Sequence, residues 1–332
     1  MSVFKTVLAA LFLAAAPALA QEASVAEAFE RLSQGDYEGA RAIAAPLAEA
    51  GDRDAQHMLG YLDEKGLAGE KNLASAIDLY AKAANAGSAD AQFALGELAY
   101  YGEGVKQDYE RAAGWYALAA GQGHPRAQVQ LGLMRMNGDG LARDPEAAAD
   151  WFEKAARAGD ADGEFFLGAA YLGGAGREQN YRRAAEWLKK AAGKGHREAA
   201  YNLALVYDNG GVKPDAQGAD YWMRQAAEKG LPEAMVGLAL MLHDGRASGA
   251  GGERPADWFE KAANAGDPQG QFLYAVALAE GDGRDKDPRA ALRWVDRALI
   301  GADEMGDGFR ADAEALRARL AEEIAAARGG RQ

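Results

Sequence analysis

The chain repeats itself every 36 residues, and this period constrains the possible folds more than any other feature of the sequence. Seven segments align with one another, at intervals of 36 residues and one of 35. The segments start at Ala55, Ala91, Ala127, Gly163, Ala199, Ala234 and Gly270. Four residues into each segment stands a Leu, or a Tyr in the last, and a Gly or Ala follows it. A period of this length is typical of a repeat protein whose repeats stack on their neighbours.

Each repeat is predicted to contain two helices. The first is expected to end at a glycine loop such as Gly102–Gly104, because Gly tolerates the left-handed conformation that ends many helices. The second follows an acidic or proline start such as Asp144-Pro145 and ends at another Gly. Its apolar residues have helical spacing, as shown in the third repeat by Ala148, Trp151, Phe152, Ala155 and Ala156. A lone pair of short helices cannot bury this stripe, so the repeats must pack on one another.

All six tryptophans of the chain occupy one position of the repeat, where the first repeat has Leu79. They are Trp115, Trp151, Trp187, Trp222, Trp258 and Trp294. The position shares a helix face with Tyr116, Phe152 and Phe259, so we predict that these indoles form the core rather than a carbohydrate-stacking surface. Replacing one of them by Ala is then expected to cost about 3–5 kcal/mol of stability.

The combined pattern resembles the Sel1-like repeat, a relative of the tetratricopeptide repeat. It reads A-x-x-x-L-G, then G-x-G, then A-x-x-W-[YF]-x-K-A-A-x-x-G; residues 151–159 and 200–207 match it closely, and the resemblance spans 55–302. The resemblance implies an all-α fold, a right-handed α-solenoid of stacked helix-turn-helix repeats with a concave groove. It also implies an adaptor or regulatory role through protein–protein contacts, as in envelope proteins of this family, some of which hold a sensor kinase inactive.

The first twenty residues have the features of a secretory signal peptide. Lys5 supplies the positive charge, Val7–Ala16 the apolar stretch, and Ala18-Leu19-Ala20 a small-x-small cleavage site. The apolar stretch is shorter than the roughly 20 residues that span a bilayer, although an uncleaved anchor is an alternative. We therefore expect cleavage after Ala20 and a periplasmic or secreted protein that does not span the membrane.

Segments outside the regular repeats have their own predicted roles. Residues 21–54 resemble a degenerate tetratricopeptide-like unit that caps the N-terminus, with Pro46 expected to kink its second helix. Residues 303–328 are predicted to form a C-terminal capping helix, and 329–332 a flexible tail. In the sixth repeat, 245–252 replace the usual loop and are predicted to form a mobile hinge. The apolar face of the capping helix is expected to contain Phe309, Ala313, Leu316, Leu320 and Ile324.

Composition and motifs argue against several classes of function. A net charge of −13 disfavours nucleic-acid binding, and the absence of Cys excludes thiol catalysis and cysteine metal sites. The sequence contains no HExxH helix, no calcium-binding loop, no phosphate-binding Gly-Lys-Ser/Thr loop and no G-x-S-x-G elbow. We therefore predict no catalytic residue, no cofactor and no metal.

Three of the four histidines invite a specific interpretation. His124 and His196 directly follow the Gly that ends a second helix, and we expect them to cap the next helix or to be solvated. His243 lies on the predicted inner stripe beside Asp244, where it could be an ordinary surface residue or could titrate and bind a partner.

If the repeats stack as in tetratricopeptide proteins, residues two, six and nine after each start share the face that lines the groove. In the first repeat these are His57, Tyr61 and Glu64. The residues that we predict to bind a partner are Phe93, Glu97, Tyr100, Leu133, Met136, Phe165, Leu172, Tyr201, Asp208 and His243. Two interpretations remain open. Curvature buries the stripe between successive first helices, or the stripe is an apolar channel rimmed by carboxylates that binds a peptide or amphipathic helix bearing Lys or Arg.

These features together predict a periplasmic scaffold or regulator that binds a polypeptide in its groove. The partner would be another protein or peptide, such as an envelope sensor or enzyme. One alternative is a weak β-lactamase or penicillin-binding activity, with which some cysteine-rich exported relatives have been credited, although this chain has no Cys. A second alternative is binding of cell-wall glycan.

Overall fold

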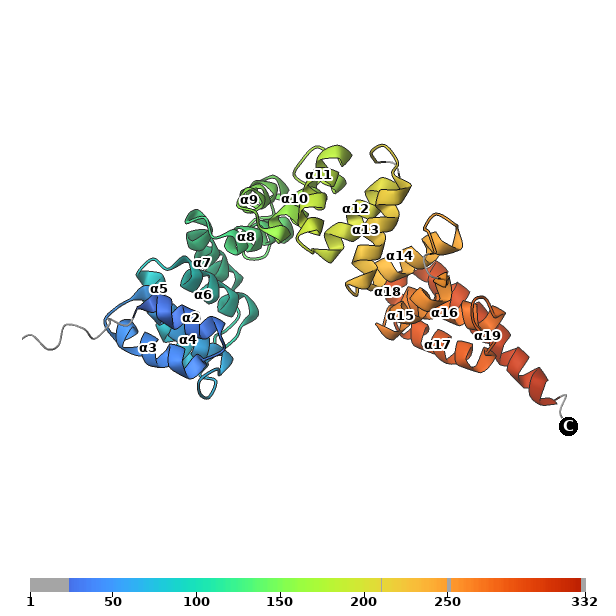
Figure 1. Cartoon of the computed structure of the whole chain (residues 1–332), viewed down its shortest axis with the longest axis horizontal. Helices are drawn as coiled ribbons and strands as arrows, with labels where there is room; N and C mark the ends of the chain where they lie inside the picture. Colours follow the sequence, from blue (N-terminus) through green and yellow to red (C-terminus); the bar gives the residue numbers. More distant parts are fainter. Residues whose placement is uncertain (1–23, 210, 250–251, 330–332) are drawn as a thin grey trace, which may run out of the picture. The chain divides into compact units, whose positions relative to one another are not determined.

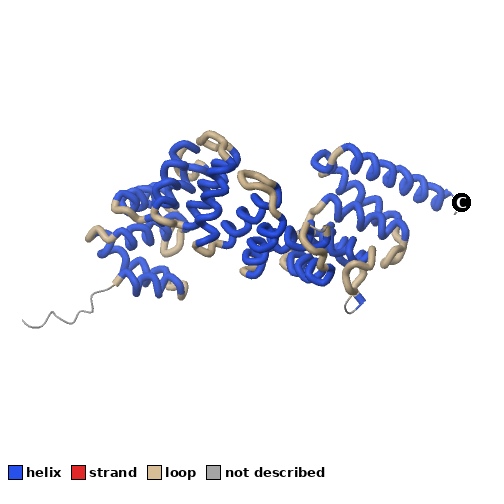
Figure 2. Tube along the Cα trace, turned by 90° about the horizontal axis from the view of Figure 1, so that it is seen from above, coloured by secondary structure: helices blue, strands red, loops and turns tan. Residues whose placement is uncertain are grey.

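The computed structural model describes residues 24–209, 211–249 and 252–329, and within these ranges the chain is helical with no strand (Figure 2). The chain divides into two compact bodies, Met1–Asp144 and Pro145–Gln332, called here the N-terminal and C-terminal bodies. The predicted signal peptide lies outside the described residues, as does the predicted tail apart from Gly329, which ends the last helix.

Each body is a series of helices joined by short loops (Figure 1). The helices of the N-terminal body are α2 (Val25–Ser33), α3 (Tyr37–Glu49), α4 (Arg53–Lys65), α5 (Leu73–Asn85), α6 (Ala89–Tyr101), α7 (Tyr109–Gly121) and α8 (Pro125–Asn137). Those of the C-terminal body are α9 (Pro145–Arg157), α10 (Ala161–Gly173), α11 (Tyr181–Gly193), α12 (Arg197–Asp208), α13 (Ala216–Glu228), α14 (Pro232–His243), α15 (Pro255–Asn264), α16 (Pro268–Glu280), α17 (Pro288–Ile300), α18 (Ala302–Met305) and α19 (Asp307–Gly329). Within each body every helix packs on the next, which confirms the predicted solenoid of helix-turn-helix repeats.

In most repeats the first helix begins at a capping side chain and ends at a glycine. Asp52, Ser88, Asp160 and Asp267 each accept a hydrogen bond from the backbone N–H three residues later, which satisfies a donor that the helix leaves free. At the other end the chain leaves the helix through a glycine in the left-handed region, such as Gly102 at φ 75°. The predicted glycine stops are thereby confirmed.

In the first three repeats a glutamine joins the first helix to the second helix before it. The side-chain amides of Gln56, Gln92 and Gln128 each donate to a backbone carbonyl eight residues earlier, over 3.1 to 3.3 Å. These carbonyls lie in the last turn of the preceding helix, where no partner within the helix is left for them. The fourth repeat has Glu164 instead, which cannot donate and is bound by Lys194 at 2.7 Å. The repeat interface therefore contains a directional polar contact as well as apolar packing.

The core of each repeat is formed by the residue that follows the tryptophan position. These side chains are Tyr80, Tyr116, Phe152, Leu188, Met223, Phe259 and Val295, and all are buried. The small residue of the first helix makes room for them: a Cβ on Gly96 would lie 2.5 Å from Cε1 of Tyr116. Glycine is therefore required here to admit an aromatic ring rather than a helix backbone.

The expectation that the tryptophans themselves form the core is wrong for five of the six. Trp258 is buried with 4% exposure, whereas the other five are half-buried. Neighbouring residues of a helix point about 100° apart, and in these five repeats the residue after the tryptophan faces the core more directly. The indoles lie at its edge, and the ammonium groups of Lys154 and Lys190 lie 3.5 Å and 3.7 Å from the ring centroids of Trp151 and Trp187.

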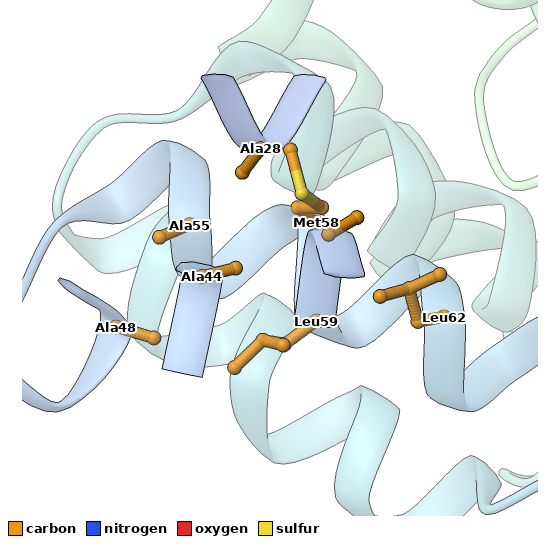
Figure 3. Packing of buried hydrophobic residues seen from close by; sticks show 8 residues of the cluster. Ala28, Ala44, Ala48, Ala55, Met58, Leu59 and Leu62 are labelled. Atoms are coloured by element: carbon orange, nitrogen blue, oxygen red, sulfur yellow. The ribbon is translucent and has the colours of Figure 1, made fainter. Parts of the chain in front are cut away.

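The N-terminal segment packs on the first repeat: Ala28 and Ala44 belong to one buried cluster with Met58 and Leu62, and Figure 3 shows Ala28 beside Met58. Small side chains on α2 and α3 permit close packing against α4. The helix α3 runs through Pro46 to Glu49 without interruption, so proline does not end it.

The segment predicted as a hinge in the sixth repeat is attached to α13 on both sides of its undescribed residues 250–251. The guanidinium of Arg224 donates to the carbonyl of Ser248 at 3.0 Å and binds Glu253 at 2.6 Å. The carboxylate of Asp220 accepts from the Ser248 hydroxyl at 3.1 Å. A hinge role for 245–252 therefore has to include the breaking of these contacts.

The C-terminal helix α19 packs against α17 through the face expected from the sequence. Ala313, Leu316 and Leu320 are buried, and the ring of Phe309 meets that of Phe272 edge-on at 5.4 Å. The helix begins at Asp307 rather than near 303, because the short helix α18 precedes it.

Candidate functional site

A pocket of about 400 Å³ lies along the first helices α4, α6 and α8 of the N-terminal body. Side chains along α4 and α6, from the start of α8 and from one loop surround it, together with one tyrosine of α5. We call it the tyrosine pocket, and its lining is His57, Tyr61, Glu64, Lys65, Tyr80, Asp90, Phe93, Ala94, Glu97, Leu98, Tyr101, Glu103, His124 and Arg126. Two of the residues predicted to bind a partner, Phe93 and Glu97, are among them.

Phe93 forms the apolar part of the pocket wall and is itself covered on its flat faces. The imidazole of His124 stacks on it with a centroid distance of 4.8 Å, and the guanidinium of Arg126 lies 4.7 Å from the ring centroid. His124 is held at both nitrogens. Its Nδ1 accepts from the N–H of Ala127 at 3.1 Å, and its Nε2 lies 3.2 Å from a carboxylate oxygen of Asp90. The prediction that His124 caps a helix is thereby confirmed.

The carboxylates of the pocket are oriented by tyrosine hydroxyls of the second helices. Tyr80 donates to Glu64 at 2.8 Å, and Tyr116 donates to Glu97. Burial raises the pKa of Tyr80 and of Tyr116 far above the usual value, so both hydroxyls stay protonated and remain donors. The hydrogen bond from His124 lowers the pKa of Asp90, which keeps that carboxylate ionised.

Negative charge in the tyrosine pocket is only partly compensated. Lys65 binds Glu64. Within the described part of the chain, neither Glu97 nor Glu103 forms an ion pair. Tyr61 and Tyr101 flank these carboxylates and are 36% and 57% exposed. The pocket can therefore offer a guest both aromatic surface and unpaired carboxylates.

The other predicted residues of the N-terminal body lie outside the pocket lining. Tyr100 packs against the rings of Tyr101 and Tyr109, at 5.0 Å each, and its hydroxyl donates to Asp139 at 3.3 Å. Leu133 and Met136 are half-buried on α8. Tyr100 thus supports the exposed Tyr101 from behind rather than lining the pocket.

In the C-terminal body the predicted residues are distributed over several positions. Phe165 stacks on His196 at 4.3 Å and repeats the Phe93–His124 arrangement, with His196 Nδ1 accepting from Ala199 at 3.2 Å. Leu172 lines a hollow of about 310 Å³ between α10 and α12, which we call the α10–α12 hollow. Tyr201 is half-buried.

Asp208 and His243, the last two residues predicted to bind a partner, are less suited to line a groove. Asp208 already binds Arg246, and His243 is an exposed residue at the end of α14. The structure therefore does not bring all ten predicted residues together.

The sequence pattern did not select several lining residues of the tyrosine pocket. Tyr101 and Glu103 follow the regular stripe positions and enter the loop after α6, and Arg126 stands in the first turn of α8. A search for residues around the glycine loop of each first helix would have found the first two. Among the described residues, no three His, Asp or Glu side chains are grouped as a metal site would need.

Family comparison gives the repeats a name. The model of the Sel1 repeat matches residues 53–88, 89–124, 125–160, 161–196, 197–231, 232–267 and 268–299. The chain belongs to the Sel1 repeat family. Proteins with Sel1 repeats commonly mediate protein–protein interactions, and their scaffold is generally not enzymatic. A comparison with curated proteins found no match.

Solved structures of Sel1 repeat proteins resemble this chain. A Sel1 repeat protein from Oxalobacter formigenes is 32% identical over 72% of this chain and 96% of its own, with a TM-score of 0.65. A protective antigen present in uropathogenic Escherichia coli strains is 29% identical over 84% of this chain and 68% of its own, with a TM-score of 0.49. In the part of this Sel1 repeat chain that the structure describes, no helix has the length and apolar character needed to cross a bilayer.

Proposed function

We propose that this Sel1 repeat protein is a periplasmic scaffold or regulator that holds a polypeptide segment of another protein against its first helices. The observation that carries the proposal is the tyrosine pocket, where exposed tyrosines and unpaired carboxylates from successive first helices surround a solvent-accessible space. Exposed aromatic surface of this kind is costly for a solvated face and common at protein interfaces.

The α10–α12 hollow supports the same role in the C-terminal body. Leu172 and Leu205 contribute apolar surface from two successive first helices, and Tyr181 adds an aromatic ring that is 39% exposed. An extended or helical segment could bury these side chains without rearranging the repeats.

Regulation would follow from a difference in affinity. If the segment is free in one state of the partner and packed away in another, binding stabilises the first state by the difference in binding free energy. A partner such as an envelope sensor or enzyme would be held in one state without any chemistry in the scaffold.

Export to the periplasm is supported by the leader motif in residues 1–20. We expect the N-terminal sequence of protein recovered from the periplasm to start at Gln21. An intact N-terminus in the membrane fraction would indicate an uncleaved anchor instead.

Carbohydrate stacking on the tryptophans is a weaker alternative. Lys154, Lys190 and Lys261 place their ammonium groups 3.5 to 3.7 Å from the indole centroids of Trp151, Trp187 and Trp258. A sugar ring would have to displace these cations from the faces that it would use.

Site-specific photocrosslinking tests the proposal. A photoreactive amino acid at Tyr201, on a first helix, should capture a polypeptide in intact cells, whereas the same amino acid at Glu228, exposed on the second helix α13, should not. Leu172→Glu should lower capture at 201 about tenfold by placing a charge in the apolar hollow. Equal capture from both positions, or capture that Leu172→Glu leaves unchanged while the chain stays folded, would contradict the proposal.

A further inference from the structure

We propose that the tyrosine pocket binds an arginine side chain of the polypeptide partner. This inference rests on the proposed function and narrows it, since the sequence pattern alone led us to expect either Lys or Arg. It follows from the charge, the aromatic walls and the shape of the pocket.

The charge of the pocket favours a cationic guest. Four carboxylates line it, from Glu64, Asp90, Glu97 and Glu103, against the cations Lys65 and Arg126. Lys65 neutralises Glu64. The side chains of Glu97 and Glu103 have no ion-pair partner among the described residues, so a guest cation would gain attraction without breaking an existing ion pair.

The aromatic walls favour a flat cation. Tyr61 on α4 and Tyr101 on α6 border the pocket, and both have exposed ring surface. A guanidinium plane stacks on such rings and is more weakly hydrated than an ammonium group. The pocket already contains one such contact, because the guanidinium of Arg126 lies 4.7 Å from the centroid of Phe93.

The carboxylate geometry also favours arginine over lysine. Glu97 is oriented by the hydroxyl of Tyr116 and by the amide of Gln130 at 3.4 Å, both of which bind Oε1. Its Oε2 is left for a guest. A guanidinium presents several N–H groups in a fixed plane and can donate to more than one carboxylate oxygen, whereas an ammonium is a single point charge. A volume of about 400 Å³ leaves room for the side chain and adjoining backbone.

Ligand-observed NMR with small probes tests this assignment on the full mature chain. The probe is N-acetyl-L-arginine methylamide, and the matched neutral probe is the citrulline analogue, which has nearly the same shape without the charge. We expect the arginine probe to bind at least about tenfold more tightly than the citrulline probe and about threefold more tightly than the lysine analogue. The binding should weaken as ionic strength rises.

Two pairs of substitutions supply the control. Glu97→Gln with Glu103→Gln should weaken the arginine probe about tenfold, since it removes both unpaired charges while the amide oxygen introduced at position 97 can still accept from Tyr116. Glu146→Gln with Glu178→Gln makes the same change of net charge on exposed residues of the C-terminal body and should leave binding unchanged. Should Glu97→Gln impair folding, Glu103→Gln alone, in the loop after α6, is expected to weaken the probe about threefold.

Equal binding of the arginine and citrulline probes, equal binding of the lysine analogue, or equal loss in both pairs of variants would overturn the assignment. None of these outcomes depends on the photocrosslinking experiment at Tyr201. That experiment probes the C-terminal body and tests the proposed function separately. Capture at position 201 without selectivity for the arginine probe would support the proposed scaffold function and contradict only the arginine site.

Discussion

The imidazole of His124 stacks on the ring of Phe93 at a centroid distance of 4.8 Å while its Nδ1 caps the helix α8. The same relationship recurs two repeats later between His196 and Phe165, at 4.3 Å. Each histidine also places Nε2 beside an Asp of the preceding first helix, at 3.2 Å from Asp90 and 3.4 Å from Asp162. One side chain thus joins the end of one repeat to the start of the next.

Replacing His124 by Ala should therefore lower the free energy of unfolding by about 1–2 kcal/mol, because the helix loses its cap and Phe93 loses a stacking partner. His124→Asn should recover part of this loss, since Asn can still cap the helix. Chemical denaturation followed by circular dichroism measures both. His243→Ala, at an exposed helix end, is the control, and a loss as large as that of His124→Ala would contradict the explanation.

Neighbouring aromatic residues of α9 should differ sharply in their contribution to stability. Phe152→Ala should cost about 3–5 kcal/mol, because Phe152 is buried and leaves a cavity. Trp151→Ala should cost less than half as much, because the indole is half-buried at the edge of the core. Urea denaturation of the two variants compares them directly. Equal losses of stability in the two variants would show that Trp151 contributes to the core as much as Phe152 does.

Acid should destabilise the N-terminal body through His57. Burial lowers the pKa of His57, and the charge of His124 acts in the same direction. The nearby carboxylates of Asp90, Asp54 and Glu64 raise the pKa but do not reverse the shift. The unfolded chain then binds a proton at His57 at a higher pH than the folded chain, so the free energy of unfolding falls as the pH drops below about 6.5. Since Gln does not titrate, His57→Gln should reduce the difference in urea midpoint between pH 7.5 and pH 5.5. An unchanged difference would mean that other groups cause the acid sensitivity.

The buried Glu164 should depend on Lys194. Glu164 is 3% exposed, and its carboxylate is bound by the Lys194 ammonium at 2.7 Å. Lys194→Met should cost about 3 kcal/mol, because it leaves an uncompensated buried charge. Adding Glu164→Gln should restore most of the loss, since the first three repeats have Gln at this position and use it to donate to a carbonyl. Thermal unfolding of the single and double variants checks this, and additive losses would show that the two residues are not coupled.

Much of the fold could be predicted because it depends on local properties of the sequence. Gly102 needs a left-handed conformation, and His124 follows the end of a helix, so both roles follow from the chemistry of one residue and its neighbours. Such local signals recur from one repeat to the next, so they can be distinguished from chance occurrences.

The candidate site was less predictable because it depends on which side chains reach a common space. Tyr100 and Tyr101 are neighbours in the sequence, yet Tyr101 lines the tyrosine pocket and Tyr100 packs behind it. Periodicity places a residue on a face of its own helix but does not say how far its side chain extends past the next helix.

Backbone geometry within a few residues imposes the two helices of each repeat, their capping residues and the small residues between them, so these features and the repeat length can be predicted from the amino-acid sequence alone. Packing in three dimensions sets two further features: the core belongs to the residue after each tryptophan, and Glu97 and Glu103 find no ion-pair partner among the residues that the structure describes. Burial and charge pairing are set by the neighbours that packing brings together, and those neighbours lie on other helices of the chain.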